Sequence, residues 1–305
     1  MKPLITITLQ FISITMLAQS PVVTLNQYFK EAKNGSYATA PQSLFDQGND
    51  FDLLLSELEK YQSDSTARIR AKAYRLSNRI AQVSEDESVK QKAIDQQIKA
   101  LNDPDRGIAG NAIEAMTNFK NTVFIESQKT RILNHLNAET PHFNDFVKLL
   151  GFLQLKKAES QLVGLIALKE SPVTKWNIRL ALARMNNQSA IEYIISKLEK
   201  APINDAFAYD IVPGLVYTRQ PQIFKFLESQ ILNDEANCST ADPNSNQKIT
   251  CAYRIMEAIA PPIENFPLPT DEFGDLMVDD YEKALIELRK WFEQNETYSL
   301  NQEVY

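Results

Sequence analysis

The chain carries little of the material that nucleophilic or metal-dependent catalysis needs. Its 305 residues include two histidines, His135 and His142, and two cysteines, Cys238 and Cys251. A Ser–His or Cys–His pair requires a histidine held beside the nucleophile, and a catalytic zinc site requires several His or Cys ligands. The sequence also contains no glycine-rich phosphate loop. It therefore indicates no catalytic residue, no metal site and no cofactor, and we expect a protein that is not an enzyme.

Carboxylates are the remaining catalytic material, because 39 residues are Asp or Glu. Two carboxylates held close together can act as general acid and general base. Nothing in the sequence marks a particular pair. The alternative function is accordingly a hydrolase or lyase that uses carboxylates on cell-wall or glycan material.

One polar stretch matches part of a calcium-binding loop. Asp242, Asn244 and Asn246 occupy the first three ligand positions of such a loop. The match then fails, because Gln247 stands where the loop needs Gly and Tyr253 stands where it needs a bidentate Glu. The pattern favours an ordinary polar turn.

The two cysteines flank this polar insertion at 239–250. In an oxidising compartment, two cysteines that close a short loop are expected to form a disulfide. In a reducing cytosol, both would remain free thiols. Their spacing is not that of the two-residue redox motif, so a catalytic redox role is not expected.

Binding is the function that the remaining side chains favour. Polar or aromatic residues stand on segments whose other face is apolar, so helices would present them at a surface. The binding candidates are Trp176, Arg179, Arg75, Arg79 and Asn111, with Glu114 and Lys148 on equivalent faces. Each also fits an ordinary solvated helix face. Trp176 ranks first because binding hot spots are enriched in Trp, and its alternative is a position in the core.

The stretch 103–119 is the clearest of the helices that must position these side chains. Asp103 is expected to cap the helix, with Pro104 at the first helical position, where its missing N–H costs no hydrogen bond. The apolar residues then follow one helical face: Ile108, Ala112, Ala115, Met116 and Phe119.

The same apolar register recurs along the chain at steps of 32 to 42 residues. It begins at Ala73, Ala112, Phe146, Ile178, Asp210 and Ala252, and the copy at Asp210 is degraded. Second apolar helices lie between these copies, so each unit reads as a helical hairpin. Because one hairpin cannot bury both of its faces alone, successive hairpins must stack. The sequence thus predicts an all-α fold, a right-handed α-solenoid of about six hairpins, with an irregular helical bundle as the alternative.

Two stretches carry a family resemblance. Asp-Pro-Asp at 103–105 with the apolar positions that follow, and Leu-Ala-Arg-Met-Asn-Asn-Gln-Ser-Ala-Ile-Glu-Tyr-Ile at 182–194, resemble the HEAT and HEAT-like repeats, including the phycobilisome-lyase type. The chain departs from that pattern at Thr140-Pro141 and Pro213-Gly214. The resemblance implies a scaffold or adaptor whose protein or peptide partner lies on the concave face, along the second helix of each pair. It places no catalytic residue on this chain.

The predicted organisation begins with a signal peptide at 1–18. Lys2 precedes an apolar run from Leu4 to Leu17, and Ala18 before Gln19 fits a cleavage site. The run is too short to span a membrane. The domain prediction continues with an irregular N-terminal cap at 19–50 that holds a short amphipathic segment at 25–32, a solenoid at 51–260, a Pro-rich acidic linker at 261–280, and a C-terminal helix and tail at 281–305.

The composition limits the classes of partner. Hydrophobic residues make up 44% and charged residues 23%, which is typical of a globular chain. The formal net charge is −7, and an acidic protein binds the phosphates of nucleic acids poorly. We therefore expect a periplasmic or secreted binding or scaffold protein with a protein or peptide partner, for example in the cell envelope, with no nucleic acid and no membrane span.

Overall fold

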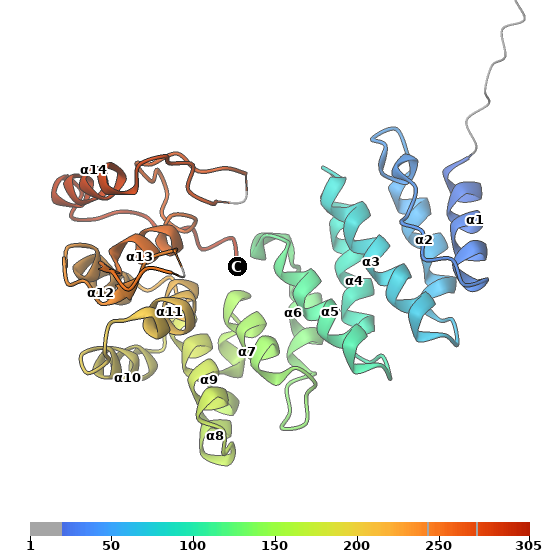
Figure 1. Ribbon diagram of the computed structural model, residues 1–305. Coiled ribbons are helices and arrows are strands. Elements are labelled where there is room, and N and C mark those ends of the chain that lie inside the picture. The colour runs from blue at the N-terminus through green and yellow to red at the C-terminus, as the bar shows by residue number, and fades with distance from the viewer. Residues whose placement is uncertain (1–19, 243, 273) are drawn as a thin grey trace, which may run out of the picture.

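The computed structural model describes residues 20–242, 244–272 and 274–305, and the described chain is mostly helical (Figure 1). The predicted signal peptide and its cleavage site lie outside these residues. The helices are α1 (Pro21–Lys33), α2 (Phe51–Gln62), α3 (Ala67–Val83), α4 (Glu87–Ala100), α5 (Arg106–Thr117), α6 (Glu126–Leu133), α7 (Phe143–Phe152), α8 (Glu159–Leu168), α9 (Pro172–Arg184), α10 (Gln188–Leu198), α11 (Val212–Tyr217), α12 (Pro221–Ile231), α13 (Ala252–Ile259) and α14 (Tyr281–Gln294). Short 3-10 helices cover Gln42–Phe45, Asn121–Val123 and Lys156–Ala158, and a π-helix covers Phe207–Ile211. No helix in the described ranges is both long enough and apolar enough to cross a membrane.

The helices pack as two rows. In the first, α3, α5, α7, α9, α11 and α13 contact one another in that order, and we call this the odd row. In the second, α2 contacts α4 and α4 contacts α6, while α10 contacts α12 and α12 contacts α14. The rows are joined by contacts between helices adjacent in sequence, such as α2 with α3 and α4 with α5. Figure 1 shows the helices following an arc, with the end of the chain inside it.

The apolar register predicted from the sequence falls on the odd row. Its positions are buried in α3, α5, α7, α9 and α13. In the degraded copy, Asp210 and Pro213 are exposed instead. A π-helix precedes α11 there and accommodates more residues per turn than an α-helix, so the register shifts and Val212, Leu215 and Val216 face the core. Pro213 is tolerated because it lies in the first turn of α11.

The start of α5 differs from the prediction. Asp103 was expected to cap a helix starting at Pro104, but α5 begins at Arg106 and its cap is Asp105. The Asp105 carboxylate accepts from the main-chain N–H of Gly107 at 2.9 Å. Asp103 is engaged elsewhere, because its two oxygens accept from the Arg70 guanidinium at 2.7 Å each. A partner 33 residues away therefore decides which aspartate caps the helix.

The first and last helices, α1 and α14, cover the amphipathic segments expected at 25–32 and from Tyr281 onward. The segment expected at 25–32 lies in α1, which begins four residues earlier, so the predicted N-terminal cap is less irregular than expected. Leu25, Phe29 and Ala32 are buried at helical spacing, and Pro21 stands at the helix start, where a missing N–H is tolerated. At the other end, the Asp280 carboxylate caps α14 by accepting from the N–H of Lys283, and residues 295–305 then run back toward the middle of the molecule (Figure 1).

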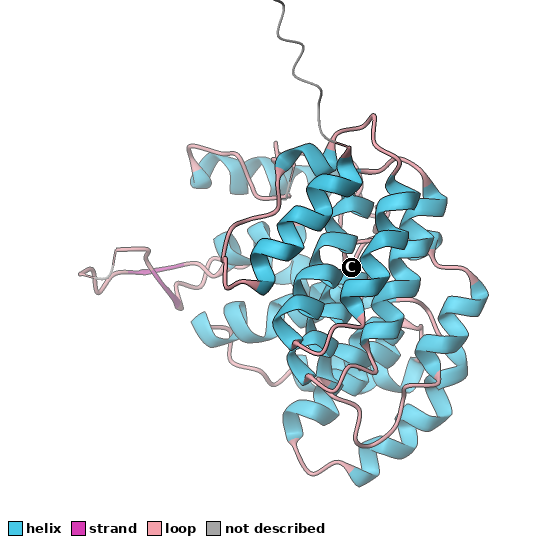
Figure 2. Ribbon diagram, turned by 90° about the vertical axis from the view of Figure 1, so that its right-hand side faces the viewer, coloured by secondary structure: helices cyan, strands magenta, loops and turns pink. Residues whose placement is uncertain are grey.

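One small sheet departs from the all-α prediction. Strands β1 (Cys238–Ser239) and β2 (Lys248–Ile249) pair antiparallel, with Cys238 opposite Ile249. Figure 2 shows this hairpin extending away from the helices. It was missed because two-residue strands are too short to show alternation of apolar and polar residues.

The close packing of α7 on α9 in the odd row depends on a glycine. A Cβ atom at Gly151 in α7 would lie 2.8 Å from the main-chain oxygen of Ala181 in α9 and would also meet the Tyr217 hydroxyl. That hydroxyl donates to the main-chain oxygen of Lys148. Any side chain at position 151 must therefore push α7 and α9 apart.

We predict that Gly151→Ala destabilises the fold whereas Gly164→Ala does not. Overpacking at position 151 is expected to lower the free energy of unfolding by about 1–3 kcal/mol. Gly164 lies in α8 with nothing near its would-be Cβ, so alanine there is expected to add about 0.5–1 kcal/mol through helix propensity. Urea unfolding of both variants measures the difference. Equal stability of the two variants would contradict the close packing of α7 on α9.

Candidate functional site

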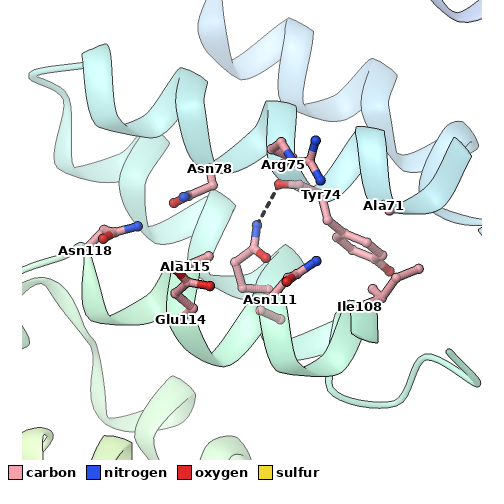
Figure 3. A pocket seen from close by; sticks show the side chains of 11 residues that line it. Ala71, Tyr74, Arg75, Asn78, Ile108, Asn111, Glu114, Ala115 and Asn118 are labelled. Atoms are coloured by element: carbon pink, nitrogen blue, oxygen red, sulfur yellow. Dashed lines mark hydrogen bonds between the residues drawn. The ribbon is translucent and has the colours of Figure 1, made fainter. Parts of the chain in front are cut away.

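A cavity of about 310 Å³ lies between α3 and α5 (Figure 3). Its lining mixes small apolar residues with amide and charged side chains: Ala71, Tyr74, Arg75, Asn78, Gln97, Ile108, Asn111, Ala112, Glu114, Ala115 and Asn118. Ala112 and Ala115 of α5 and Ala71 of α3 are small, which leaves room between the two helices. We call it the α3–α5 cavity.

Three residues contribute polar groups in and around this cavity. The side-chain amide of Gln97, from α4, donates to the main-chain oxygen of Tyr74 at 3.0 Å. Burial raises the pKa of the Tyr74 hydroxyl to about 12, so Tyr74 stays neutral at physiological pH. The Asn78 Oδ1 atom is buried and has no hydrogen-bond partner among the described residues. An unpaired buried acceptor of this kind costs about 1–3 kcal/mol.

A second cavity, of about 440 Å³, continues along the odd row between α5 and α7. It shares Asn111 and Glu114 with the α3–α5 cavity. Its other lining residues are Gly107, Gly110, Ile113, Thr117, His142, Asp145, Lys148 and Tyr305. Because the two cavities share residues of α5, they adjoin across that helix and together follow α3, α5 and α7. We call them together the odd-row groove.

The α7 side of this groove is held by local contacts. His142 precedes α7 in a left-handed conformation, with φ of 50°, and its Nε2 atom lies 3.0 Å from the main-chain oxygen of Arg106. Asp145 and Lys148 stand one turn apart with 4.0 Å between carboxylate and ammonium. The groove therefore presents charges of both signs to a ligand.

The ion pair between Arg70 and Asp103 connects the two helices that line the α3–α5 cavity. It joins the first turns of α3 to the turn before α5, and the two side chains are only 11% and 3% exposed. The hydrogen bonds from Arg70 hold the pKa of Asp103 below its ordinary value, against the opposing effect of burial. The pair therefore holds together the two helices that line the cavity.

The structure brings two of the five predicted binding residues together. Arg75 and Asn111 are exposed and line the α3–α5 cavity. Arg79 lies beside a neighbouring cavity of about 200 Å³, with its guanidinium 3.8 Å from the centre of the Phe45 ring. Glu114 and Lys148, on the equivalent faces, both line the groove.

The two predicted residues on α9 lie apart from the odd-row groove. Trp176 is partly buried and packs against the core, which is the alternative position considered for it. The guanidinium of Arg179 lies 3.8 Å from the centre of the Tyr193 ring and donates to the main-chain oxygen of Lys175. Neither residue lines the two cavities of the groove.

Several groove residues were missed from the sequence. Asn78 and Asn118 are polar residues at the ends of apolar helical faces, and that position is the signal that could have indicated them. His142 and Asp145 stand at the start of α7, and nothing in the sequence marked them as binding residues. Tyr305 lies on a non-helical tail, where periodicity gives no information about which helices it contacts.

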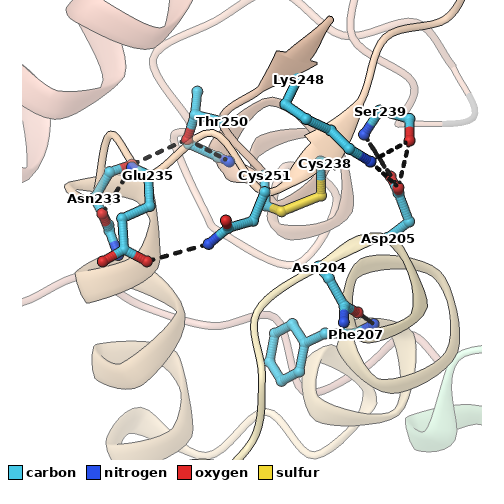
Figure 4. The surroundings of a disulfide bond; sticks show 12 residues. Asn204, Asp205, Phe207, Asn233, Glu235, Cys238, Ser239, Lys248, Thr250 and Cys251 are labelled. Carbon is cyan, nitrogen blue, oxygen red and sulfur yellow. Dashed lines mark hydrogen bonds and ion pairs between the residues drawn. A yellow bond between two sulfur atoms is a disulfide. The ribbon is translucent and has the colours of Figure 1, made fainter. Parts of the chain in front are cut away.

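The disulfide between Cys238 and Cys251 is present, as predicted, with a Cα–Cα distance of 5.0 Å (Figure 4). It closes the loop that carries β1 and β2, and both cysteines are buried. Asp205 holds the hairpin to the π-helix region by accepting from the N–H and hydroxyl of Ser239. These hydrogen bonds lower the pKa of Asp205.

Neither a metal site nor a similarity to known proteins indicates the function, so the groove is the basis for the proposal below. Over the described ranges, no group of three or more His, Cys, Asp or Glu side chains could hold a metal ion. No model of a known protein family matches the chain, and no curated protein matches it.

We predict that Asp103→Asn lowers the free energy of unfolding by about 2 kcal/mol at neutral pH, because it removes charge-assisted hydrogen bonds from a buried pair. Asp95→Asn is the matched control, since Asp95 pairs with Arg131 at an exposed site and is expected to cost less than about 1 kcal/mol. The Asp103 pKa is lowered in the folded state, so its contribution is present above about pH 4 and is lost as pH falls further. Denaturant unfolding from pH 7 to pH 3 measures this. A difference between native and Asp103→Asn protein that does not shrink on acidification would contradict the assignment.

We also predict that reduction of the disulfide lowers stability by about 3 kcal/mol, because the bond closes a loop over a sequence separation of 13 residues in the unfolded chain. The Cys238→Ser/Cys251→Ser double variant should reproduce the shift and become insensitive to reductant. Thermal unfolding with and without dithiothreitol provides the measurement. An equal response to reductant in the native and double-variant proteins would show that the disulfide is not its cause.

Proposed function

We propose that this chain is a HEAT-like α-solenoid that binds a protein or peptide partner along the odd-row groove and is not an enzyme. The contacts of odd-row helices in sequence order, and the apolar register buried on them, support the solenoid. The resemblance of 103–116 and 182–194 to HEAT repeats supports the same reading. In such repeats the second helix of each pair lines the binding face, and the odd row consists of those second helices.

The observation that carries the binding proposal is the composition of the groove. Arg75 stands on α3, and Asn111 and Glu114 stand on α5. Asp145 and Lys148 continue this row of donors and acceptors on α7. An elongated polar groove suits an extended chain, whose main-chain N–H and C=O groups recur along its length.

The proposed setting is the periplasm or the extracellular space. The disulfide fits an oxidising compartment, and the predicted signal peptide would bring the chain there. The partner is then an exported or envelope-associated protein.

The alternative, a carboxylate hydrolase or lyase, has one observation in its favour. Glu114 of α5 and Asp145 of α7 line the same cavity. If the purified protein cleaves cell-wall glycan and the Glu114→Gln variant does not, the chain is a hydrolase or lyase and the binding proposal is wrong.

We predict that a photoreactive benzoylphenylalanine in place of Asn111 crosslinks a specific partner in cells of the source organism. Arg75→Glu in the same chain reverses a charge in the groove and is expected to reduce the crosslinked product about tenfold or more. Mass spectrometry of the crosslinked band identifies the partner and the contacting residue.

Lys200→Glu is the matched control, because Lys200 is an exposed cation in the turn after α10, away from the groove. This charge reversal should leave the crosslink unchanged, and circular dichroism should show the same helix content in all variants. If position 111 yields no more product than the same photoreactive residue placed at position 200, the groove is not the binding site.

A further inference from the structure

The last residues of the sequence form an extended segment that lies against the ends of several odd-row helices. The main-chain oxygen of Ser299 accepts from Glu264, and Leu300 forms an isolated antiparallel bridge with Ile263, which follows α13. The segment then passes the C-terminal ends of α11, α9 and α7. Figure 1 shows its end inside the arc of helices. We call residues 301–305 the tail.

Every main-chain oxygen of the tail accepts a hydrogen bond from outside it. Among the described residues, the donors come from three: Asn121, Arg184 and Arg219. The bonds run from Arg219 Nε to Asn301 O (3.1 Å), Asn121 Nδ2 and Arg184 Nη2 to Gln302 O (2.9 and 3.1 Å), Asn121 N to Glu303 O (2.9 Å), Arg184 Nη2 to Val304 O (2.8 Å) and Arg219 Nη2 to Tyr305 O (2.9 Å). These donors recognise the main chain, which every peptide shares.

The two arginines are built into the fold. Arg184 is fully buried and Arg219 is 3% exposed. Arg184 also donates to the main-chain oxygen of Tyr217, and Arg219 to that of Val216, so both side chains are held by the end of α11. Burial lowers the pKa of Arg184 to about 10, and burial together with the neighbouring Arg184 lowers that of Arg219 to about 9. Both remain cations at neutral pH, and a buried cation requires acceptors.

Side-chain recognition is concentrated at the last position of the tail. The Tyr305 ring packs against Phe152, at 5.6 Å between ring centres, and against Tyr217, at 5.3 Å. Glu303 contributes an ion pair with Lys120, but both side chains are about half exposed, so this contact is weak. The ring of Tyr305 is therefore the selective element.

We propose that Asn121, Arg184 and Arg219 form a peptide site that reads an extended main chain and prefers an aromatic residue at the fifth position, and that the tail is its internal occupant. The inference rests on the proposed peptide-binding function and extends it. Tyr305 also lines the odd-row groove, so an extended ligand lying in the groove reaches the tail's position. Tethering gives the tail an effective concentration of the order of millimolar, so a free peptide must compete with it.

The test uses the full chain and a fluorescein-labelled peptide of the sequence of residues 299–305, Ser-Leu-Asn-Gln-Glu-Val-Tyr, followed by fluorescence anisotropy. The native chain should bind it weakly, because its own tail occupies the site. Tyr305→Ala, which removes the ring of the internal occupant, should bind it about tenfold or more tightly. A peptide ending in Ala instead of Tyr should lose that gain, and Arg219→Met added to Tyr305→Ala should abolish binding.

If a variant fails to fold, hydrogen exchange of the native chain tests the same proposal without any substitution. The amides of the tail should exchange through a local opening that leaves α9 and α11 protected. Exchange of the tail only together with α9 and α11, or a folded Tyr305→Ala chain that does not bind the peptide, would show that the tail is a permanent part of the core. Neither result would affect the crosslink from position 111, so failure here is distinct from failure of the proposed function.

Discussion

The buried Arg184 guanidinium needs hydrogen-bond acceptors. This constraint holds together the end of α9, the end of α11 and the tail. This side chain ends α9, lies within about 6 Å of the Phe152 and Tyr217 ring centres, and donates to main-chain oxygens of α11 and of the tail. A buried cation without acceptors would cost several kcal/mol, so the ends of these helices and the tail must come together around it. This arrangement of helix ends and tail places Tyr305 at the edge of the odd-row groove, which runs along α3, α5 and α7.

Most of the helical framework could be predicted, because apolar periodicity is a local property of the sequence. Ala112, Met116 and their counterparts face the core in five of the six copies. The prediction failed where a distant contact or a backbone irregularity decided the outcome. Arg70 engages Asp103, so Asp105 caps α5, and the π-helix before Pro213 shifts the register of α11. The apolar periodicity of a single helix reveals neither the distant ion pair nor the π-helix.

The groove was only partly predictable, for related reasons. Arg75 and Asn111 stand on the polar sides of amphipathic helices, and their exposure followed from periodicity. That they lie together depends on the packing of α3 beside α5, which the stacking of hairpins implied. Trp176 was ranked by residue type alone, and residue type does not distinguish an interface from a core. Arg184 was an arginine inside an apolar run, Leu-Ala-Arg-Met, which in retrospect is the sequence signal of a buried cation.

The central claim is that the chain binds an extended partner across α3, α5 and α7. A crystal structure of the full chain with the peptide identified by crosslinking tests this claim most directly. The account predicts extended peptide density across the three helices, with contacts to Arg75, Asn111 and Glu114. Peptide bound only on the helices of the other row, with the odd-row groove unchanged, would contradict it.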